Sequence, residues 1–211
     1  MTTFQRAEAS TFWGREIGLM YVHAHLRYAE ALSRVGDGAG LLRALALASP
    51  WGLTERVPQA RPRQRSCYYS SSDGAFADRA EASERYADLM AGKVPLEGGW
   101  RVYSSGPGLA LRLVVERLLG LRRRADLVEV DPVLPSGADG LTATVRLAGR
   151  AARVTYRVGP EGVGVRRVTG AHGDLDLTDL TNPHRRPGAS VRTDDLRAAL
   201  DAAPEITVET F

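Results

Sequence analysis

Two adjacent hydroxyl groups precede a helical pattern near the middle of the chain. Ser104 and Ser105 stand directly before Gly106 and Pro107, and proline suits the first turn of a helix because its missing N–H would lack a partner there. The free N–H groups and the dipole of a helix start favour anions, and Gly106 allows close backbone approach. The segment therefore predicts an anion cradle. Serine is also a preferred helix N-cap, so a purely structural cap explains the same residues.

His23 is the second candidate side chain, at the start of an apolar pattern with helical spacing. An imidazole can carry charge or donate a hydrogen bond to an anion near neutral pH. His25 follows two positions later, and this spacing places the two rings on different faces of a helix, unlike the i,i+4 pair that binds a metal. With four histidines and one cysteine in the chain, we expect no metal site. Taken alone, a histidine at such a position is also typical of a structural role.

Other charged and glycine-rich patterns lack the context that their chemistry needs. Residues 36–40 (Gly-Asp-Gly-Ala-Gly) have neither the preceding strand nor the lysine of a phosphate-binding loop, and predict a turn. Arg122, Arg123 and Arg124 form a tight basic run. This run predicts a helix C-terminus, where positive charge complements the dipole, rather than a nucleic-acid surface.

The composition is that of an ordinary globular protein, 44% hydrophobic and 25% charged, with a net charge of +3. Cys67 is the single cysteine, which excludes an intrachain disulfide and favours an intracellular setting. No apolar run approaches the ~20 residues that span a bilayer, and residues 1–15 lack the apolar core of a signal peptide. We therefore expect a cytoplasmic chain with no membrane and no nucleic-acid partner.

The spacing of apolar residues predicts the helices and strands that must position the candidate residues. This spacing is helical in the first half of the chain and changes after Arg124. Four helices are predicted, at residues 17–35, 41–48, 81–91 and from Pro107 onward. A long polar stretch, residues 51–78, separates the second from the third, and loops of that length are usually functional. Strands are predicted at 127–130, 141–147, 152–158, 163–168 and 206–208, with a helix at 194–202.

Helices followed by strands predict an α+β fold with two segregated parts. We place the boundary after residue 124, with helices in residues 1–124 and a small β domain in residues 125–211. The helical part has few helices and one very long loop. We therefore expect it to leave apolar helix faces uncovered.

Four segments, in this order, resemble the C-terminal portion of the cellobiose phosphorylase family (glycoside hydrolase family 94) and its cyclic glucan synthase relatives. They are residues 21–23 (Tyr-Val-His), residues 100–108 (Trp-Arg-Val-Tyr-Ser-Ser-Gly-Pro-Gly), residues 118–121 (Leu-Leu-Gly-Leu) and residues 131–135 (Asp-Pro-Val-Leu-Pro). The second is similar to the family's Trp and Tyr-Thr-Gly-Ser-Ala-Gly pattern, and the last to its Asp-Pro-Cys-Ile-Pro. The resemblance implies that the helices belong to a partial (α/α)6 toroid and that the β domain is a jelly-roll-like β-sandwich.

The resemblance also implies an anion site. It places His23 on the family's phosphate-contacting histidine, Ser104 on a phosphate-binding threonine, and Ser105 on the adjacent glycine, beside Gly106. Serine in place of threonine keeps the hydroxyl. Serine in place of glycine adds a side chain beside the anion, which leaves phosphate, water or another acceptor open as the nucleophile.

Four further residues would border the sugar: Tyr68, Tyr69 and Asp73 in the long loop, and Trp100. The resemblance places no catalytic residue in this chain. In the family an aspartic acid protonates the leaving oxygen while phosphate attacks the anomeric carbon with inversion, and that acid lies upstream of the segments matched here.

These features predict part of a carbohydrate-active enzyme that resembles inverting β-glucan or disaccharide phosphorylases. Inorganic phosphate would be the co-substrate, with an oligosaccharide or disaccharide and no further cofactor. We expect the chain to be inactive alone and to require another chain, or a longer N-terminal region, that completes the barrel. The alternative is a non-catalytic carbohydrate-binding or assembly subunit that pairs with another chain.

Overall fold

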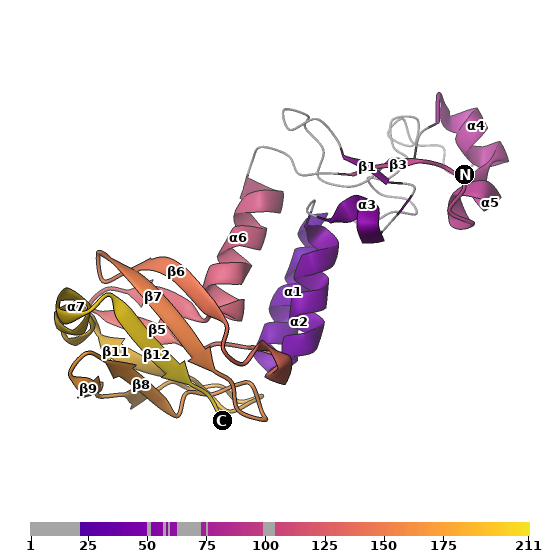
Figure 1. Cartoon of the computed structure of the whole chain (residues 1–211). Coiled ribbons are helices and arrows are strands. Elements are labelled where there is room, and N and C mark those ends of the chain that lie inside the picture. Colours follow the sequence, from indigo (N-terminus) through magenta and orange to yellow (C-terminus); the bar gives the residue numbers. More distant parts are fainter. Residues whose placement is uncertain are drawn as a thin grey trace. The chain divides into compact units, whose positions relative to one another are not determined.

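The computed structural model describes residues 22–49, 52–56, 58, 60–62, 73–74, 76–98 and 104–211 (Figure 1). The chain divides into two compact units, one of Met1–Tyr28 with Ala44–Ala110, the other of Ala29–Arg43 with Leu111–Phe211. The fold is mixed α+β: a few helices precede two β-sheets, and the described residues form no closed barrel. The predicted division after residue 124 stays a prediction.

Two helices joined by a glycine turn begin the described chain. Helix α1, Val22–Val35, buries Val22, Leu26 and Ala29 at spacings of four and three residues, the pattern of one helix face. Gly36 then adopts a φ of +84°, which favours glycine and stops the helix. Helix α2, Gly38–Ala48, starts where Asp37 Oδ1 accepts a hydrogen bond from Gly40 N at 2.7 Å. The predicted turn is confirmed at Gly36 and Asp37, but residues 38–40, also predicted as turn, belong to α2.

A second helical run carries the Ser-Ser-Gly segment. It consists of a π-helical turn η2, Ser104–Gly108, the helix α6, Leu109–Leu113, and a second π-helical turn η3, Val114–Leu118. Gly120 follows with a φ of +69°, and a Cβ built on it would lie 2.1 Å from Pro132 N. Glycine is therefore required here, because the backbone at Asp131 and Pro132 occupies the space of a side chain. This contact joins the Leu-Gly-Leu and Asp-Pro segments of the sequence.

Two sheets share one hydrophobic core in the second unit. The first has the strand order β10-β11-β5-β4 and the second the order β6-β7-β12-β8-β9. Their bounds are β4 Leu121–Arg124, β5 Leu127–Val130, β6 Thr142–Leu147, β7 Arg150–Arg157, β8 Arg167–Gly170, β9 Gly173–Asp174, β10 Thr178–Asp179, β11 Ala189–Arg192 and β12 Glu205–Glu209. The short 3-10 helix η4, Ser136–Ala138, precedes β6. Helix α7, Thr193–Ala202, connects β11 to β12 and buries Leu196, Ala199 and Leu200 in the same core.

Tyr156 on β7 is the largest fully buried side chain of this core. Its hydroxyl donates to the carbonyl of Leu119 at 2.7 Å, at the point where the helical run ends. Burial raises the pKa of the Tyr156 hydroxyl well above its usual range, so the group stays a neutral donor. The bond fixes the C-terminal end of the helical run to β7.

Tyr156→Phe is expected to lower the free energy of unfolding by about 1–3 kcal/mol, because the ring volume is kept while the Leu119 carbonyl loses its buried donor. Urea unfolding monitored by circular dichroism measures the change. Tyr28→Phe, at an exposed tyrosine, is the control and should leave the midpoint in place. Equal midpoints for both variants would show that the hydroxyl contributes nothing.

The remaining elements are short and belong to the first unit. They are α3 Leu53–Arg56, β1 Ala60–Pro62, β2 Asp73–Gly74, α4 Arg79–Glu84, α5 Tyr86–Met90 and β3 Leu96–Gly98, with the strands ordered β1-β3-β2. The predicted helix at 81–91 is wrong in detail, since Arg85, with φ −104° and ψ 20°, divides it into α4 and α5. Asp78 caps α4 by accepting from Glu81 N at 2.9 Å.

Two further predictions are corrected. Arg122, Arg123 and Arg124 lie in strand β4, not at a helix C-terminus, because Gly120 turns the chain and Arg122 pairs across the sheet with Glu129. The predicted strand at 163–168 begins only at Arg167, because Gly162 and Gly164 have φ values of +66° and +71°, outside the strand region.

Candidate functional site

The candidate anion-binding residues lie on two segments that the fold brings together in the first unit. Val22, the first residue of α1, is buried, and so is Gly106 in η2. A Cβ built on Gly106 would lie 3.9 Å from Val22 Cγ1, which is ordinary van der Waals distance. About 80 residues separate the two segments in the sequence. The first turn of α1, which carries His23, therefore lies near Gly106 in the Ser104–Gly108 turn.

His23 is half-buried, and Arg27 lies one turn further along the same helix. Arg27 Nε donates to His23 Nε2 over 3.4 Å, a long hydrogen bond that places the imidazole proton on Nδ1 in this arrangement. The guanidinium adds a permanent positive charge beside the imidazole. Arg27 was not predicted as a site residue, although its i,i+4 spacing from His23 is the signal that pairs side chains on one helix face.

His25 has a different role. Its Nε2 lies 2.7 Å from the Ala44 carbonyl oxygen, and because a carbonyl can only accept, the imidazole donates. The ring is also tilted at 49° to Tyr28, with the centroids 6.3 Å apart. His25 thus ties α1 to α2, which confirms that the two histidines face different surroundings.

Exchanging the two histidines for alanine should give opposite results. His25→Ala is expected to lower the free energy of unfolding by about 1–3 kcal/mol, because the Ala44 carbonyl loses its donor, and to leave phosphate affinity unchanged. His23→Ala is expected to weaken phosphate binding with little change in stability. Thermal unfolding and calorimetric titration with inorganic phosphate measure the two effects. A loss of phosphate affinity in the His25 variant alone would contradict the assignment.

The structure describes Ser104 and Ser105 as backbone only, in the first turn of η2. Asp73 lies in β2, paired with Glu97 of β3, and its side chain is likewise outside the described part. Tyr68, Tyr69 and Trp100 lie outside the described residues. The roles of these six residues stay predictions.

Neither a metal centre nor a membrane span is found in the part of the chain that the structure describes. That part contains no cluster of three or more histidine, cysteine, aspartate or glutamate residues placed to hold a metal ion. None of its helices combines the length and apolar character that crossing a membrane requires.

Two known proteins are similar in sequence. Over 161 residues, 76% of this chain, the sequence is 42% identical to a 1,2-beta-oligoglucan phosphorylase of Listeria innocua serovar 6a. Over 58 residues, 28% of the chain, it is 41% identical to the cyclic beta-(1,2)-glucan synthase NdvB of Rhizobium meliloti. The matches span 15% and 2% of the length of these two proteins. No family model matches the chain.

Proposed function

We propose that this chain, which belongs to the cellobiose phosphorylase family (glycoside hydrolase family 94) through its homology to the 1,2-beta-oligoglucan phosphorylase, forms one wall of a phosphorolytic active site. The reaction is the inverting transfer of a glucosyl residue from a β-1,2-linked oligoglucan to inorganic phosphate. The chain holds the phosphate, and the general acid comes from a part of the enzyme outside it. The helices belong to a partial (α/α)6 toroid, followed by a jelly-roll-like β-sandwich.

The observation that carries this proposal is the approach of α1 to η2. A Cβ built on Gly106 would lie at van der Waals distance from Val22, so the turn that bears His23 lies near the segment that contains Ser104 and Ser105. The family resemblance assigns phosphate contacts to these same two segments. Arg27 adds a positive charge at the same helix turn.

The proposed chemistry follows from these groups. Phosphate attacks the anomeric carbon from the face opposite to the leaving oxygen, which inverts the configuration. His23 and the Ser104 hydroxyl hydrogen-bond the phosphate oxygens and orient one of them toward the anomeric carbon. For His23 Nε2 to donate to the phosphate, its bond from Arg27 must give way. Ser105 lies where the family has glycine and narrows the space beside the phosphate.

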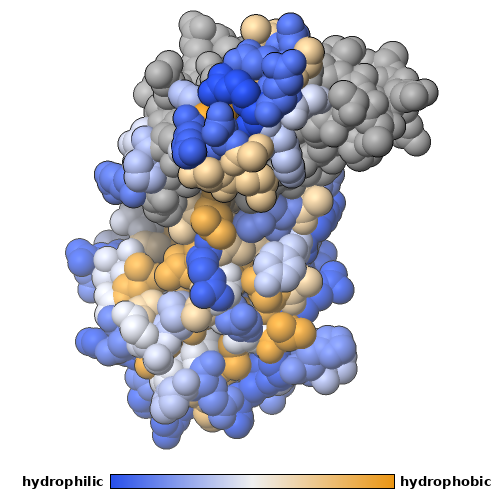
Figure 2. All heavy atoms as spheres, turned by 90° about the vertical axis from the view of Figure 1, so that its right-hand side faces the viewer, coloured by the Kyte–Doolittle hydropathy of each residue, from blue (hydrophilic) through white to orange (hydrophobic). Residues whose placement is uncertain are grey.

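Uncovered helix faces support the proposal that more chain surrounds these helices. Tyr28 and Val35 are 59% and 57% exposed and lie seven residues apart on α1, hence on one face. Leu42 and Leu47 of α2 and Leu111 of α6 are also exposed. Figure 2 shows hydrophobic residues in orange lying open among hydrophilic ones on the face that it draws. Exposed apolar groups of this kind mark surfaces that bury against a partner.

A chimera tests the proposal. The chain is inserted into the Listeria innocua phosphorylase in place of the segment to which it is homologous, and glucose 1-phosphate release from β-1,2-oligoglucan and phosphate is assayed. We expect no release from the chain alone and clear release from the chimera. The same assay with water in place of phosphate identifies the nucleophile.

The second candidate function is a non-catalytic carbohydrate-binding or assembly subunit, which the exposed apolar side chains of α1 and α2 also favour. A folded but inactive chimera, together with oligoglucan binding or stable association by the chain itself, would favour this second function over the first. Ultracentrifugation of the chain over a range of concentrations measures the association.

A further inference from the structure

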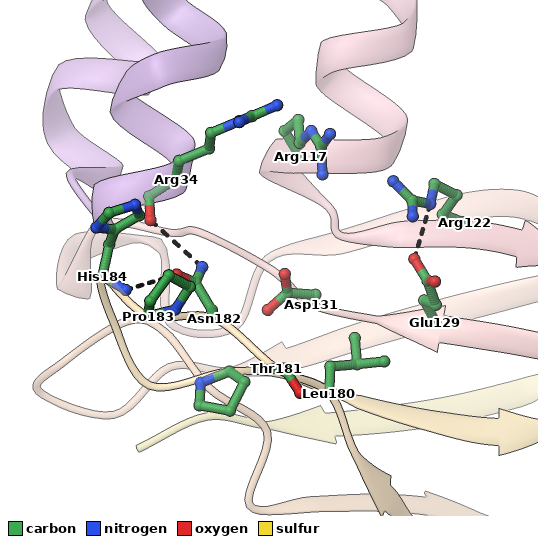
Figure 3. A pocket seen from close by; sticks show the side chains of 11 residues that line it. Arg34, Arg117, Arg122, Glu129, Asp131, Leu180, Thr181, Asn182, Pro183 and His184 are labelled. Carbon is green, nitrogen blue, oxygen red and sulfur yellow. Dashed lines mark hydrogen bonds and ion pairs between the residues drawn. The ribbon is translucent and has the colours of Figure 1, made fainter.

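A cavity of about 390 Å³ opens in the second unit, apart from the residues of the proposed active-site wall (Figure 3). Its lining comes from the end of α1, the end of the η3 turn, strands β4 and β5, and the loop that precedes β11. A cavity of this size is in the range that accommodates small-molecule ligands.

Three arginines from three separate elements meet at this cavity. Arg34 comes from α1, Arg117 from η3 and Arg122 from β4, and Figure 3 shows their guanidinium groups along one rim. Arg34 makes no ion pair with any carboxylate that the structure describes. Arg117 Nε is buried without a hydrogen-bond partner among the described residues, while Nη2 lies 3.3 Å from Glu30 Oε1. Arg122 Nε is likewise buried and unsatisfied among the described residues. Donors that converge from separate elements, with two of them unsatisfied, are typical of a site that binds an anion.

The two carboxylates in the cavity already have partners. Asp131 accepts two hydrogen bonds from Arg185, at 2.7 and 2.8 Å, and a third from Gly188 N at 2.7 Å. The Arg185 side chain is only 6% exposed, so this pair is a fixed part of the structure. Glu129 lies 2.7 Å from Arg122 Nε, without full hydrogen-bond geometry, and accepts from Arg124 Nε at 3.2 Å.

The charges around the cavity do not cancel. The charged lining residues and their described ion-pair partners comprise five arginines and three carboxylates, which leaves two positive charges: Arg34, Arg117, Arg122, Arg124 and Arg185 against Glu30, Glu129 and Asp131. A phosphate group carries close to two negative charges at neutral pH and presents several acceptor oxygens. Arginine forks match these oxygens in geometry as well as in charge.

The loop on the opposite side of the cavity carries polar residues among apolar ones and is held in place. Asn182 Nδ2 donates to the Arg34 carbonyl at 3.3 Å, and Asn182 Oδ1 accepts from His184 N at 2.9 Å (Figure 3). The loop at residues 181–184 is thereby tied to the end of α1. Thr181 and His184 also line the cavity and offer groups that hydrogen-bond sugar hydroxyls.

We propose that this cavity binds a phosphate-bearing small molecule, inorganic phosphate or a phosphorylated sugar, with Arg34, Arg117 and Arg122 as the phosphate ligands. The site is separate in residues from the proposed active-site wall and does not depend on the function proposed above.

Calorimetric titration of the full chain tests this site. The His23→Ala variant serves as the background, so that phosphate binding at the active-site wall is suppressed. Inorganic phosphate, glucose 1-phosphate and glucose are the probes, at constant ionic strength. We expect both phosphate compounds to bind and glucose to fail. Tighter binding of glucose 1-phosphate identifies the sugar phosphate as the ligand, and equal binding identifies phosphate itself.

Arg34→Ala in this background should weaken phosphate binding by about tenfold or more, because one charge-assisted hydrogen bond to the phosphate is lost. The unfolding temperature should stay unchanged, because Arg34 makes no ion pair with a described carboxylate. Adding Arg122→Ala should abolish binding. Arg146→Ala, at an exposed arginine of β6, is the matched control and should leave affinity unchanged. Absence of binding by either phosphate compound, or equal affinity in the Arg34 and Arg146 variants, would overturn the proposal.

Discussion

His23→Ala in the chimeric phosphorylase is expected to lower kcat/KM for phosphate by about tenfold to a hundredfold. The variant removes a charge-assisted hydrogen bond to the phosphate, an interaction of roughly 1.5–3 kcal/mol. Because the histidine contacts the anion and not the glucan, KM for phosphate should rise while KM for the oligoglucan stays near its original value. Steady-state kinetics with each substrate varied in turn measure both constants.

The control for this variant is His172→Ala, at an exposed histidine in the turn between β8 and β9. This variant also removes an imidazole, but at a position distant in sequence from His23 and Ser104. It should leave kcat and both KM values unchanged. Thermal unfolding of both variants separates a binding role from a structural one. If His23→Ala leaves the phosphate KM unchanged in a folded chimera, then the proposed role of His23 is wrong.

Gly120→Ala is expected to destabilise the second unit by about 4 kcal/mol or to prevent its folding. Two effects add at this residue. A φ of +69° costs a side-chain-bearing residue about 1–2 kcal/mol, and the new Cβ would lie 2.1 Å from Pro132 N and 2.2 Å from the Asp131 carbonyl carbon. Backbone atoms cannot move aside as a flexible side chain can, so the turn between η3 and β4 must open. Urea unfolding followed by circular dichroism measures the loss.

Gly140→Ala separates the two effects. Gly140 has a φ of +80°, yet a Cβ built there meets nothing within 4 Å. This variant should therefore lose only the conformational part, about 1–2 kcal/mol. If both variants lose the same free energy of unfolding, then the close approach of Asp131 and Pro132 to Gly120 does not contribute to the loss.

Local signals in the sequence were sufficient for much of the fold. The glycine after Val35 marks the end of α1 because its positive φ is cheap for glycine alone, and the short apolar runs at β5 and β12 stand between clear turn residues. Strand β4 was missed. A run of three arginines is typical of a helix end, whereas in the structure Arg122 pairs with Glu129 of β5. That pairing depends on the turn at Gly120, which the sequence pattern did not predict.

The sequence predicted the pair of segments at the proposed active-site wall but not the arginine cavity. The order of the motifs links His23 to the Ser104–Gly108 segment, and the closeness of Val22 to Gly106 agrees with that link. The arginine cavity left no trace in the sequence, since Arg34 and Arg122 lie almost 90 residues apart. They meet through helix and strand packing, which no local pattern encodes.

Strand β12 lies in the middle of its sheet, parallel to β7 on one side and antiparallel to β8 on the other. During synthesis, both neighbours leave the ribosome before β12 does. Until it arrives, β7 and β8 each present an open edge whose backbone groups can pair with another chain. Completion of this sheet must therefore wait for β12, and in that interval the two open edges favour misassembly.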